Sequence, residues 1–314
     1  MRMNAVKVKN FGAWLNNWMT IRLLLWGILS LVLSIIFFRE FWTKLPTMLS
    51  PDWVFGQQHA ASWGVLALCL IFLWLKRKQV RGQARPRATP VFILIGLAVV
   101  AAAVLMPSSQ DYLVFQVLLA SLGVFVVLFG RGARIPSILL AIYGFAISFP
   151  LAIERFAENA YSQTAIVPVM GLMTILGYPL QNQGQLVHFI SSGGEPILVT
   201  ITVGCAGPAT MGVFLAIFAL MMLDTPLSPR KAGYIFLFGA VGTWLQSIIR
   251  LIIVLMVGYY LGKDALWTAH FWTIYILFPL WYLLFAYIYF RQVGRPPDVR
   301  RKQELKHVPV TEGK

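Results

Sequence analysis

The chain of 314 residues is 59% hydrophobic and only 12% charged, with a formal net charge of +15 and a mean hydropathy of +0.74. Because a soluble globular domain is about 45–50% apolar and about 25% charged, this composition excludes a soluble enzyme, a nucleic-acid-binding module and a disordered chain. It is typical of a polytopic membrane protein.

Apolar runs long enough to cross a bilayer follow one another along the chain. A spanning helix needs roughly 20 apolar residues, with about 17–25 tolerated, and charged residues or prolines separate the runs. Eight runs have approximately this length or more: 21–38, 59–75, 90–106, 113–130, 136–153, 205–223, 232–261 and 271–290. We therefore predict an all-α polytopic membrane protein with about eight transmembrane helices.

One long connection, residues 154–204, joins the fifth run to the sixth. Its apolar stretch 165–180 is interrupted by Pro168, Gly171 and Gly177 and is short for a span, so we expect a helix that lies at the membrane interface or re-enters it. Two β-branched runs then flank a Gly-Gly pair at 193–194, which predicts a small hairpin before the sixth span.

Lysines and arginines predict the orientation of the spans, because they are enriched on the cytoplasmic side. If the spans alternate, 21 of the 26 lie on one side, and the acidic residues are concentrated on the other. Both termini are therefore expected in the cytoplasm. The basic excess then reflects topology and an affinity for anionic lipid headgroups, and we expect no nucleic-acid partner. The expected parts are five N-terminal spans (1–153), an extracytoplasmic interfacial helix and hairpin (154–204), a transmembrane core (205–290) and a basic cytoplasmic tail (291–314).

Cys205 is the stronger candidate for a nucleophile among the two cysteines. It follows the predicted hairpin at the start of the sixth span, where unpaired amide donors and the helix dipole favour a thiolate. The alternative is a small apolar residue near a helix start, the usual role of a lone membrane cysteine. Cys69 has that structural role in our interpretation, since it lies in mid-span without a charged neighbour in sequence.

Two further polar residues lie in apolar sequence at the same predicted depth. Arg250 is the one lysine or arginine well inside a predicted span, and a buried membrane cation is usually functional or paired. Snorkelling to headgroups, or a structural bond to a carbonyl, is the alternative. His270 begins the last span among tryptophans, where an interfacial structural role is the alternative. With Cys205, these residues would supply a nucleophile, an oxyanion donor and a proton carrier at one membrane face.

Other titratable residues on this face are weaker candidates. His59 and His188 are rivals of His270 for the role of the base. Glu154 and Glu158 are one helical turn apart, which favours a solvated helix over a catalytic pair. No two histidines have the spacing of metal ligands, so we expect neither a metal nor a cofactor.

The order of these residues resembles the exosortase/archaeosortase family of membrane-embedded cysteine transpeptidases. A hairpin-like stretch, Gly204-Cys-Ala-Gly207, an arginine in the next span and a histidine at the head of the last carry the resemblance, which covers about 178–290. The family commonly has Cys-Ser-Gly around the cysteine and Asn-x-x-Arg around the arginine. Here Ala206 replaces the serine and Ser247 stands at the place of the asparagine, beside Gln246. These departures suggest a divergent branch.

The resemblance implies a protease or transpeptidase of the cell membrane whose active site faces outside. Its substrates would be secreted proteins with a C-terminal sorting signal (a short motif, a transmembrane helix and a basic cluster), and its acceptor would be a lipid or a surface group. Cys205 would form a thioester, His270 would shuttle the proton, and Arg250 would stabilise the thiolate or the oxyanion.

Two other classes of function remain open at the level of sequence. One is a transporter or channel in which Arg250 binds an anion. The other is a lipid-linked acyl or glycosyl transferase at the outer leaflet, which would favour paired carboxylates at depth.

Overall fold

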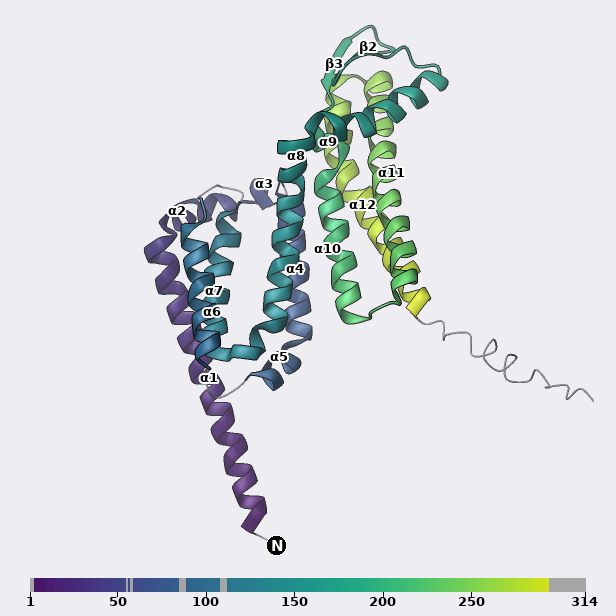
Figure 1. The fold of residues 1–314 in the computed structure, drawn as a ribbon. Coiled ribbons are helices and arrows are strands. Elements are labelled where there is room, and N and C mark those ends of the chain that lie inside the picture. Colours follow the sequence, from purple (N-terminus) through teal and green to yellow (C-terminus); the bar gives the residue numbers. More distant parts are fainter. Residues whose placement is uncertain (1–2, 55, 57–58, 85–88, 108–111, 294–314) are drawn as a thin grey trace, which may run out of the picture. The chain divides into compact units, whose positions relative to one another are not determined.

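The computed structural model describes residues 3–54, 56, 59–84, 89–107 and 112–293, and side chains from Trp18 onward. Within these residues helices dominate, and the strands form one small sheet (Figure 1). The predicted class, a helical membrane protein, is confirmed. Most of the predicted basic tail, from residue 294 on, lies outside the described residues.

The helices follow the predicted apolar runs. The N-terminal helices are α1 (Met3–Phe37), α2 (Arg39–Met48), α3 (Pro51–Val54), α4 (Ala60–Leu75), α5 (Arg77–Gln83), α6 (Pro90–Leu105), α7 (Leu113–Phe129), the 3-10 helix η1 (Gly130–Ala133) and α8 (Arg134–Ile175). After the sheet come α9 (Val203–Ala206), α10 (Pro208–Asp224), α11 (Pro229–Leu261) and α12 (Lys263–Val293). The eight runs correspond to α1, α4, α6, α7, α8, α10, α11 and α12.

Fewer than eight helices are assigned as membrane spans by their length and apolar composition. Among the described residues, four helical stretches are long and apolar enough to cross a membrane, or five when the bent pair α4–α5 counts as one span. Helices α6 and α10 contain 16 and 17 residues. At 1.5 Å per residue they measure about 24–26 Å, less than a hydrocarbon core of about 30 Å. The eight-span arrangement therefore stays a prediction.

Helix α8 contains a kink. Ala157 is non-helical (φ −141°, ψ 20°) and separates two helices within α8. The second of them contains most of the separate helix expected over 165–180, but it begins earlier and ends at Ile175. Residues 154–164 contain Glu, Arg, Ala and Gln and no Pro or Gly, so the helix resumes directly after the kink. The helix ends shortly before Gly177, whose φ of +81° favours glycine.

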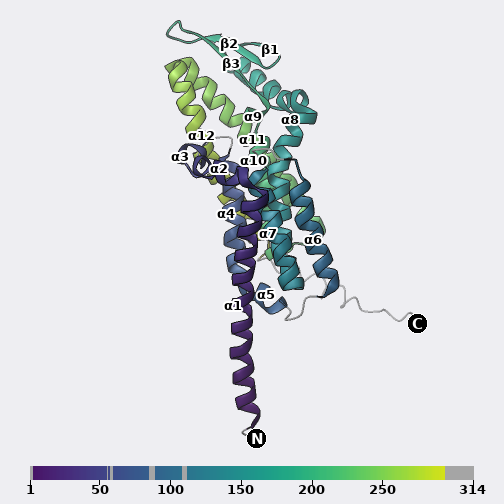
Figure 2. The ribbon, with the colours of Figure 1, turned by 90° about the vertical axis from the view of Figure 1, so that its left-hand side faces the viewer.

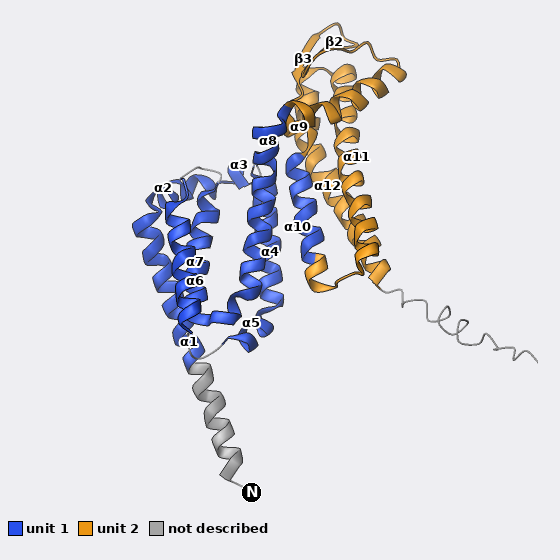
Figure 3. Cartoon of the chain, in the orientation of Figure 1, with its two compact units in different colours: residues 1–158, 208–220 blue, residues 159–207, 221–314 orange. Residues whose placement is uncertain are grey.

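The chain forms two compact units (Figure 3). Unit 1 takes in the described residues up to Glu158 together with Pro208–Leu220, and unit 2 takes in Asn159–Gly207 and the described residues from Met221 onward. Helices α8 and α10 therefore each contribute residues to both units.

Close helix packing in unit 1 depends on small residues. Helices α6 and α7 cross at Gly96 and Gly123, where a Cβ atom on either residue would lie 2.6 or 2.7 Å from the carbonyl oxygen of the other. Helix α1 packs along α7 (Figure 2), with Trp26 Nε1 donating to the carbonyl of Ser121 at 3.0 Å. Small residues and interhelical hydrogen bonds are the contacts that hold helices together in lipid.

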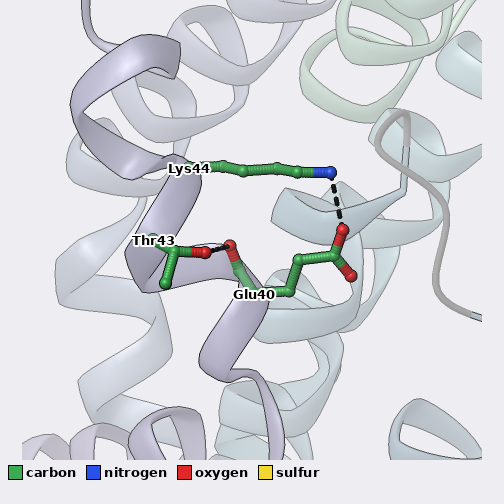
Figure 4. Close-up of polar contacts among 3 residues, drawn as sticks. All are labelled: Glu40, Thr43 and Lys44. Atoms are coloured by element: carbon green, nitrogen blue, oxygen red, sulfur yellow. Dashed lines mark hydrogen bonds and ion pairs between the residues drawn. The ribbon is translucent and has the colours of Figure 1, made fainter.

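Helix α2 carries an ion pair. Lys44 Nζ lies 2.6 Å from Glu40 Oε1, one helical turn away, and Thr43 Oγ1 donates to the carbonyl of Glu40 at 2.9 Å (Figure 4). Both charged side chains are exposed, so the pair contributes at most about 0.3–0.5 kcal/mol. It is the one ion pair found among the described residues.

In unit 2, helices α11 and α12 pack tightly along one seam. A Cβ atom on Gly242 would lie 1.9 Å from the ring of Trp281, so glycine makes room for the indole. Trp281 Nε1 donates to Thr243 Oγ1 at 3.0 Å, and Gln246 Nε2 donates to the carbonyl of Leu277 at 3.2 Å. These contacts fix the rotation of α11 relative to α12.

The predicted hairpin is present in unit 2, with one additional strand. Strands β1 (Gln181–Gln183), β2 (Leu186–Ile190) and β3 (Pro196–Thr200) form an antiparallel sheet in the order β1-β2-β3. Its buried face joins an apolar cluster with α8 and α11 through Val187, Phe189 and Ile197. The side of the membrane on which the sheet lies stays a prediction.

Candidate active site

Cys205 lies in a single helical turn, α9, shortly after the hairpin. Its N–H donates to the carbonyl of Thr202 at 3.0 Å, which closes the turn. Gly207 then has a φ of +90°, and the long helix α10 begins only at Pro208, a residue favoured at the first helical position. The predicted helix start at Cys205 is therefore wrong by three residues. Cys205 therefore lies on the one-turn helix α9 and not on the long helix α10.

The side chain of Cys205 is half-buried. Its Sγ lies 3.7 Å from Thr202 Oγ1, and its apolar side packs against the buried cluster that the sheet shares with α8, α11 and α12. The turn α9 also packs against α11, the helix that carries Arg250. The thiol is therefore held in place beside the helix that carries Arg250. It keeps the partial exposure that a reactive cysteine needs.

Arg250 is buried between α11 and α12, with 3% of its surface exposed. Its Nη2 lies 3.2 Å from each ring nitrogen of His270 and donates to the carbonyl of the same residue at 3.2 Å. Its Nε donates to Thr273 Oγ1 at 3.3 Å. The guanidinium is thus hydrogen-bonded to the next helix and does not snorkel to the headgroups. The other alternative, a structural bond to a carbonyl, is present as one of its contacts.

The charge of Arg250 has no carboxylate counter-ion among the described residues. The acidic group with which it interacts electrostatically is the thiol of Cys205. Because a buried cation is costly without a compensating charge or a full set of hydrogen bonds, the bonds from Arg250 to His270 and Thr273 are needed to hold the guanidinium in place.

His270 lies on the second turn of α12 and is partly exposed. Its ring meets the indole of Trp267 edge to face at a centroid distance of 5.7 Å. A guanidinium has donors and no acceptor, so a ring nitrogen that Arg250 bonds must be unprotonated. The contact therefore favours a neutral imidazole, which is able to accept a proton.

The three predicted residues thus gather in unit 2 around the guanidinium. Arg250 contacts His270 directly and interacts with Cys205 through its charge. The sequence predicted only that the three residues lie at the same depth in the membrane. In the structure, the packing of α9, α11 and α12 brings them together.

The rival residues lie elsewhere. His59 stacks on Trp53 in unit 1, with ring centroids 3.9 Å apart, and His188 is exposed on β2, opposite Leu198. Cys69 is buried in α4, where its Sγ lies 3.6 Å from the carbonyl of Leu139. Within the described chain, no three His, Cys, Asp or Glu side chains are close enough to hold a metal ion.

The positions that depart from the family motifs have structural partners. Ser247 is buried and its hydroxyl donates to the carbonyl of Thr243 at 3.3 Å, within α11. Gln246, beside it, makes the bond to Leu277 of α12 described above. The side-chain amide that bonds α11 to α12 is therefore that of Gln246, one residue before the position of the asparagine in the family motif.

Sequence reasoning missed two threonines at the site. Thr273 holds the Nε of Arg250, and Thr202 approaches the sulfur of Cys205. Thr273 follows His270 by one helical turn, so a search for polar residues on the same face of the last span would have found it.

The fold and these contacts define a helical membrane protein with a cysteine, arginine and histidine gathered in one unit. The family model for transmembrane exosortases matches residues 53–288, which include all three residues. The chain therefore belongs to the transmembrane exosortase family. No curated protein and no solved structure matches it.

Proposed function

We propose that this protein is a cysteine transpeptidase that cleaves the C-terminal sorting signal of secreted proteins and transfers the new carboxyl end to a lipid or surface acceptor. The observation that carries the proposal is the buried guanidinium of Arg250, which bonds His270 and has the thiol of Cys205 as its acidic neighbour. Membership of the exosortase family supports the same reaction class.

The geometry supports a role for each side chain. The imidazole of His270 takes up the proton of the Cys205 thiol, the thiolate attacks the scissile carbonyl carbon, and the carbonyl oxygen becomes an oxyanion. When the C–N bond breaks, the imidazolium gives this proton to the leaving amine and a thioester remains. The nucleophile of the acceptor then loses a proton and attacks the thioester, which frees the thiolate. His270 is the proton carrier for both transfers.

Arg250 suits the role of oxyanion donor because of how it is fixed. Nε and Nη2 bond to α12, whereas Nη1 has no hydrogen-bond partner among the described residues. A rigid donor aimed at developing charge is the most effective form of electrostatic stabilisation. The free nitrogen is the group that we assign to the oxyanion.

The sheet next to the site fits an extended peptide substrate. Strand β3 is an edge strand of the described sheet, and the chain runs from it through Thr202 into Cys205. Edge strands have unpaired backbone groups that pair with extended peptides. A substrate segment paired with β3 would present its scissile bond to the thiol.

The reaction takes place at the outer face of the cell membrane in this proposal, with both termini in the cytoplasm. The asymmetry of lysines and arginines supports this orientation. Single cysteines introduced at Lys78 and Ser192 of a cysteine-free variant would test it. A membrane-impermeant maleimide added to intact cells should label the second and not the first. The reverse pattern would place the site in the cytoplasm.

Co-expression with a candidate substrate tests the reaction. The probe is a secreted protein of the same genome whose C-terminus combines a single span with a basic end. Wild type should shorten it and form a thioester adduct that hydroxylamine releases as the hydroxamate. Cys205→Ala and His270→Ala should leave the probe uncut, whereas the matched variants Cys69→Ala and His188→Ala should cut it. Cleavage by Cys205→Ala would refute the proposal.

A further inference from the structure

Unit 1 contains an apolar pocket that the proposed reaction does not use. Helices α1, α4, α5, α7 and α8 line this half-open pocket, which has a volume of about 360 Å³. Leucines and aromatic rings form most of its wall, among them Leu66, Leu73, Leu118, Leu122, Phe125 and Leu140. Ligand pockets in proteins have volumes of about 300–1,000 Å³, so this one can accept an apolar chain.

Arginines line one end of this pocket. Arg77 and Arg81 of the short helix α5 belong to its lining. Ala84, just after α5, also lines a second, open pocket of about 690 Å³, whose lining includes Arg131 and Arg134. The two pockets share Ala84, just after α5, and their linings together contain four arginines.

These arginines have few partners in the part of the chain that the structure describes. Arg81, Arg131 and Arg134 are exposed, and the described lining of neither pocket contains an aspartate or glutamate. Arg77 stacks on Trp74 at 4.2 Å and donates to its carbonyl at 3.1 Å. The one ion pair among the described residues involves none of the four. Their positive charge is therefore available to an anion from outside the chain.

We propose that this end of unit 1 binds an anionic phospholipid, with an acyl chain in the apolar pocket and the phosphate beside Arg81, Arg131 and Arg134. Guanidinium groups match the geometry of phosphate oxygens, and basic pockets between membrane helices bind anionic headgroups. A positively charged peptide would be repelled by the same side chains, so the basic cluster of a sorting signal does not fit here. This lipid site is independent of the chemistry at Cys205.

Native mass spectrometry of the full-length protein tests the lipid site. The purified protein is titrated with phosphatidylglycerol and with phosphatidylcholine that have the same acyl chains. Wild type should retain the anionic lipid preferentially. In Arg131→Gln/Arg134→Gln this preference should fall on the order of 30-fold, which corresponds to about 1 kcal/mol for each cation. High salt should reduce the preference in wild type, because it screens exposed charges.

Two further variants separate this site from a general charge effect. The control Arg230→Gln/Lys231→Gln removes two exposed cations from the start of α11, outside both pockets, and should keep the preference. Leu140→Trp fills the apolar pocket and should reduce retention of both lipids with all arginines in place. Equal losses in the two double variants, or equal retention of both lipids by wild type, would overturn the proposal. The charge variants are decisive even if Leu140→Trp fails to fold.

Discussion

The two cysteines lie in contrasting surroundings, one in each unit. Cys69 is 5% exposed in α4 of unit 1, and its sulfur contacts the carbonyl of Leu139. Cys205 is half-buried in the one-turn helix of unit 2, next to Thr202, and interacts with the charge of Arg250. Both occur in apolar sequence. Access to the sulfur and a nearby positive charge, which determine thiol reactivity, distinguish them.

The arginines of the two units also differ in their exposure and in their hydrogen-bond partners. The arginines at the α5 end of unit 1 are exposed at the edge of a pocket, where a ligand or solvent can balance them. Arg250 of unit 2 is buried and held by hydrogen bonds to α12. A charge that cannot reach solvent must have fixed partners, and such fixed partners make a catalytic arrangement possible.

The most direct contrast between the two cysteines is expected in thiol reactivity. In the folded protein, iodoacetamide at neutral pH should modify Cys205 on the order of 100-fold faster than Cys69, because the buried thiol reacts only when the structure opens. Rates from the single variants Cys69→Ala and Cys205→Ala, followed by mass spectrometry, measure each sulfur separately. In detergent-denatured protein the two rates should converge. Similar rates in the folded protein would remove the basis of the comparison.

Arg250→Lys should lower the processing rate about 10²–10³-fold while the protein stays folded. An ammonium group keeps the charge but cannot reproduce the fixed guanidinium donors, and loss of one oxyanion donor has an effect of this size. In a Cys69→Ala background, Arg250→Gln should also slow alkylation of Cys205, since the thiolate loses its cationic neighbour. Poor accumulation of both variants, with unchanged alkylation in the folded fraction, would instead show a structural arginine.

A smaller effect is expected from crowding the seam between α11 and α12. Gly242→Ala places a methyl group against the ring of Trp281, which should destabilise the protein by about 1–3 kcal/mol. Gly233→Ala, in the same helix, has open space around its Cβ position and should be neutral or stabilising by up to about 1 kcal/mol. Thermal unfolding in detergent compares the two. Equal melting temperatures would contradict the packing described for the seam.

The smallest effect is expected at Thr273. Thr273→Val removes the acceptor for the Nε of Arg250 and leaves a buried donor unpaired, so activity should fall about ten-fold. Thr273→Ser retains the hydroxyl and should restore most of the rate. Full activity of the valine variant would show that Nε does not need this partner.

Much of the architecture could be predicted from local sequence. The length of each apolar run indicated a helix, and each of the eight runs corresponds to one. The hairpin followed from β-branched residues around a Gly-Gly turn and is present. The start of α10 was misplaced, because the left-handed Gly207 and the favoured position of Pro208 outweighed the continuity of the apolar run. The separate helix predicted after the fifth run is present beyond the kink at Ala157, but it begins before residue 165 and ends at Ile175.

Sequence by itself determined that the chain is a helical membrane protein and that Cys205, Arg250 and His270 stand out in it, because hydropathy and an isolated charge are properties of single segments. Tertiary structure decided which of these residues meet. The contact of Arg250 with His270 and Thr273 depends on the rotation of α11 against α12, which Gly242 and Trp281 help to fix. No periodicity within one helix specifies the face of another that it will contact, so only the packed structure could bring the guanidinium and the imidazole together.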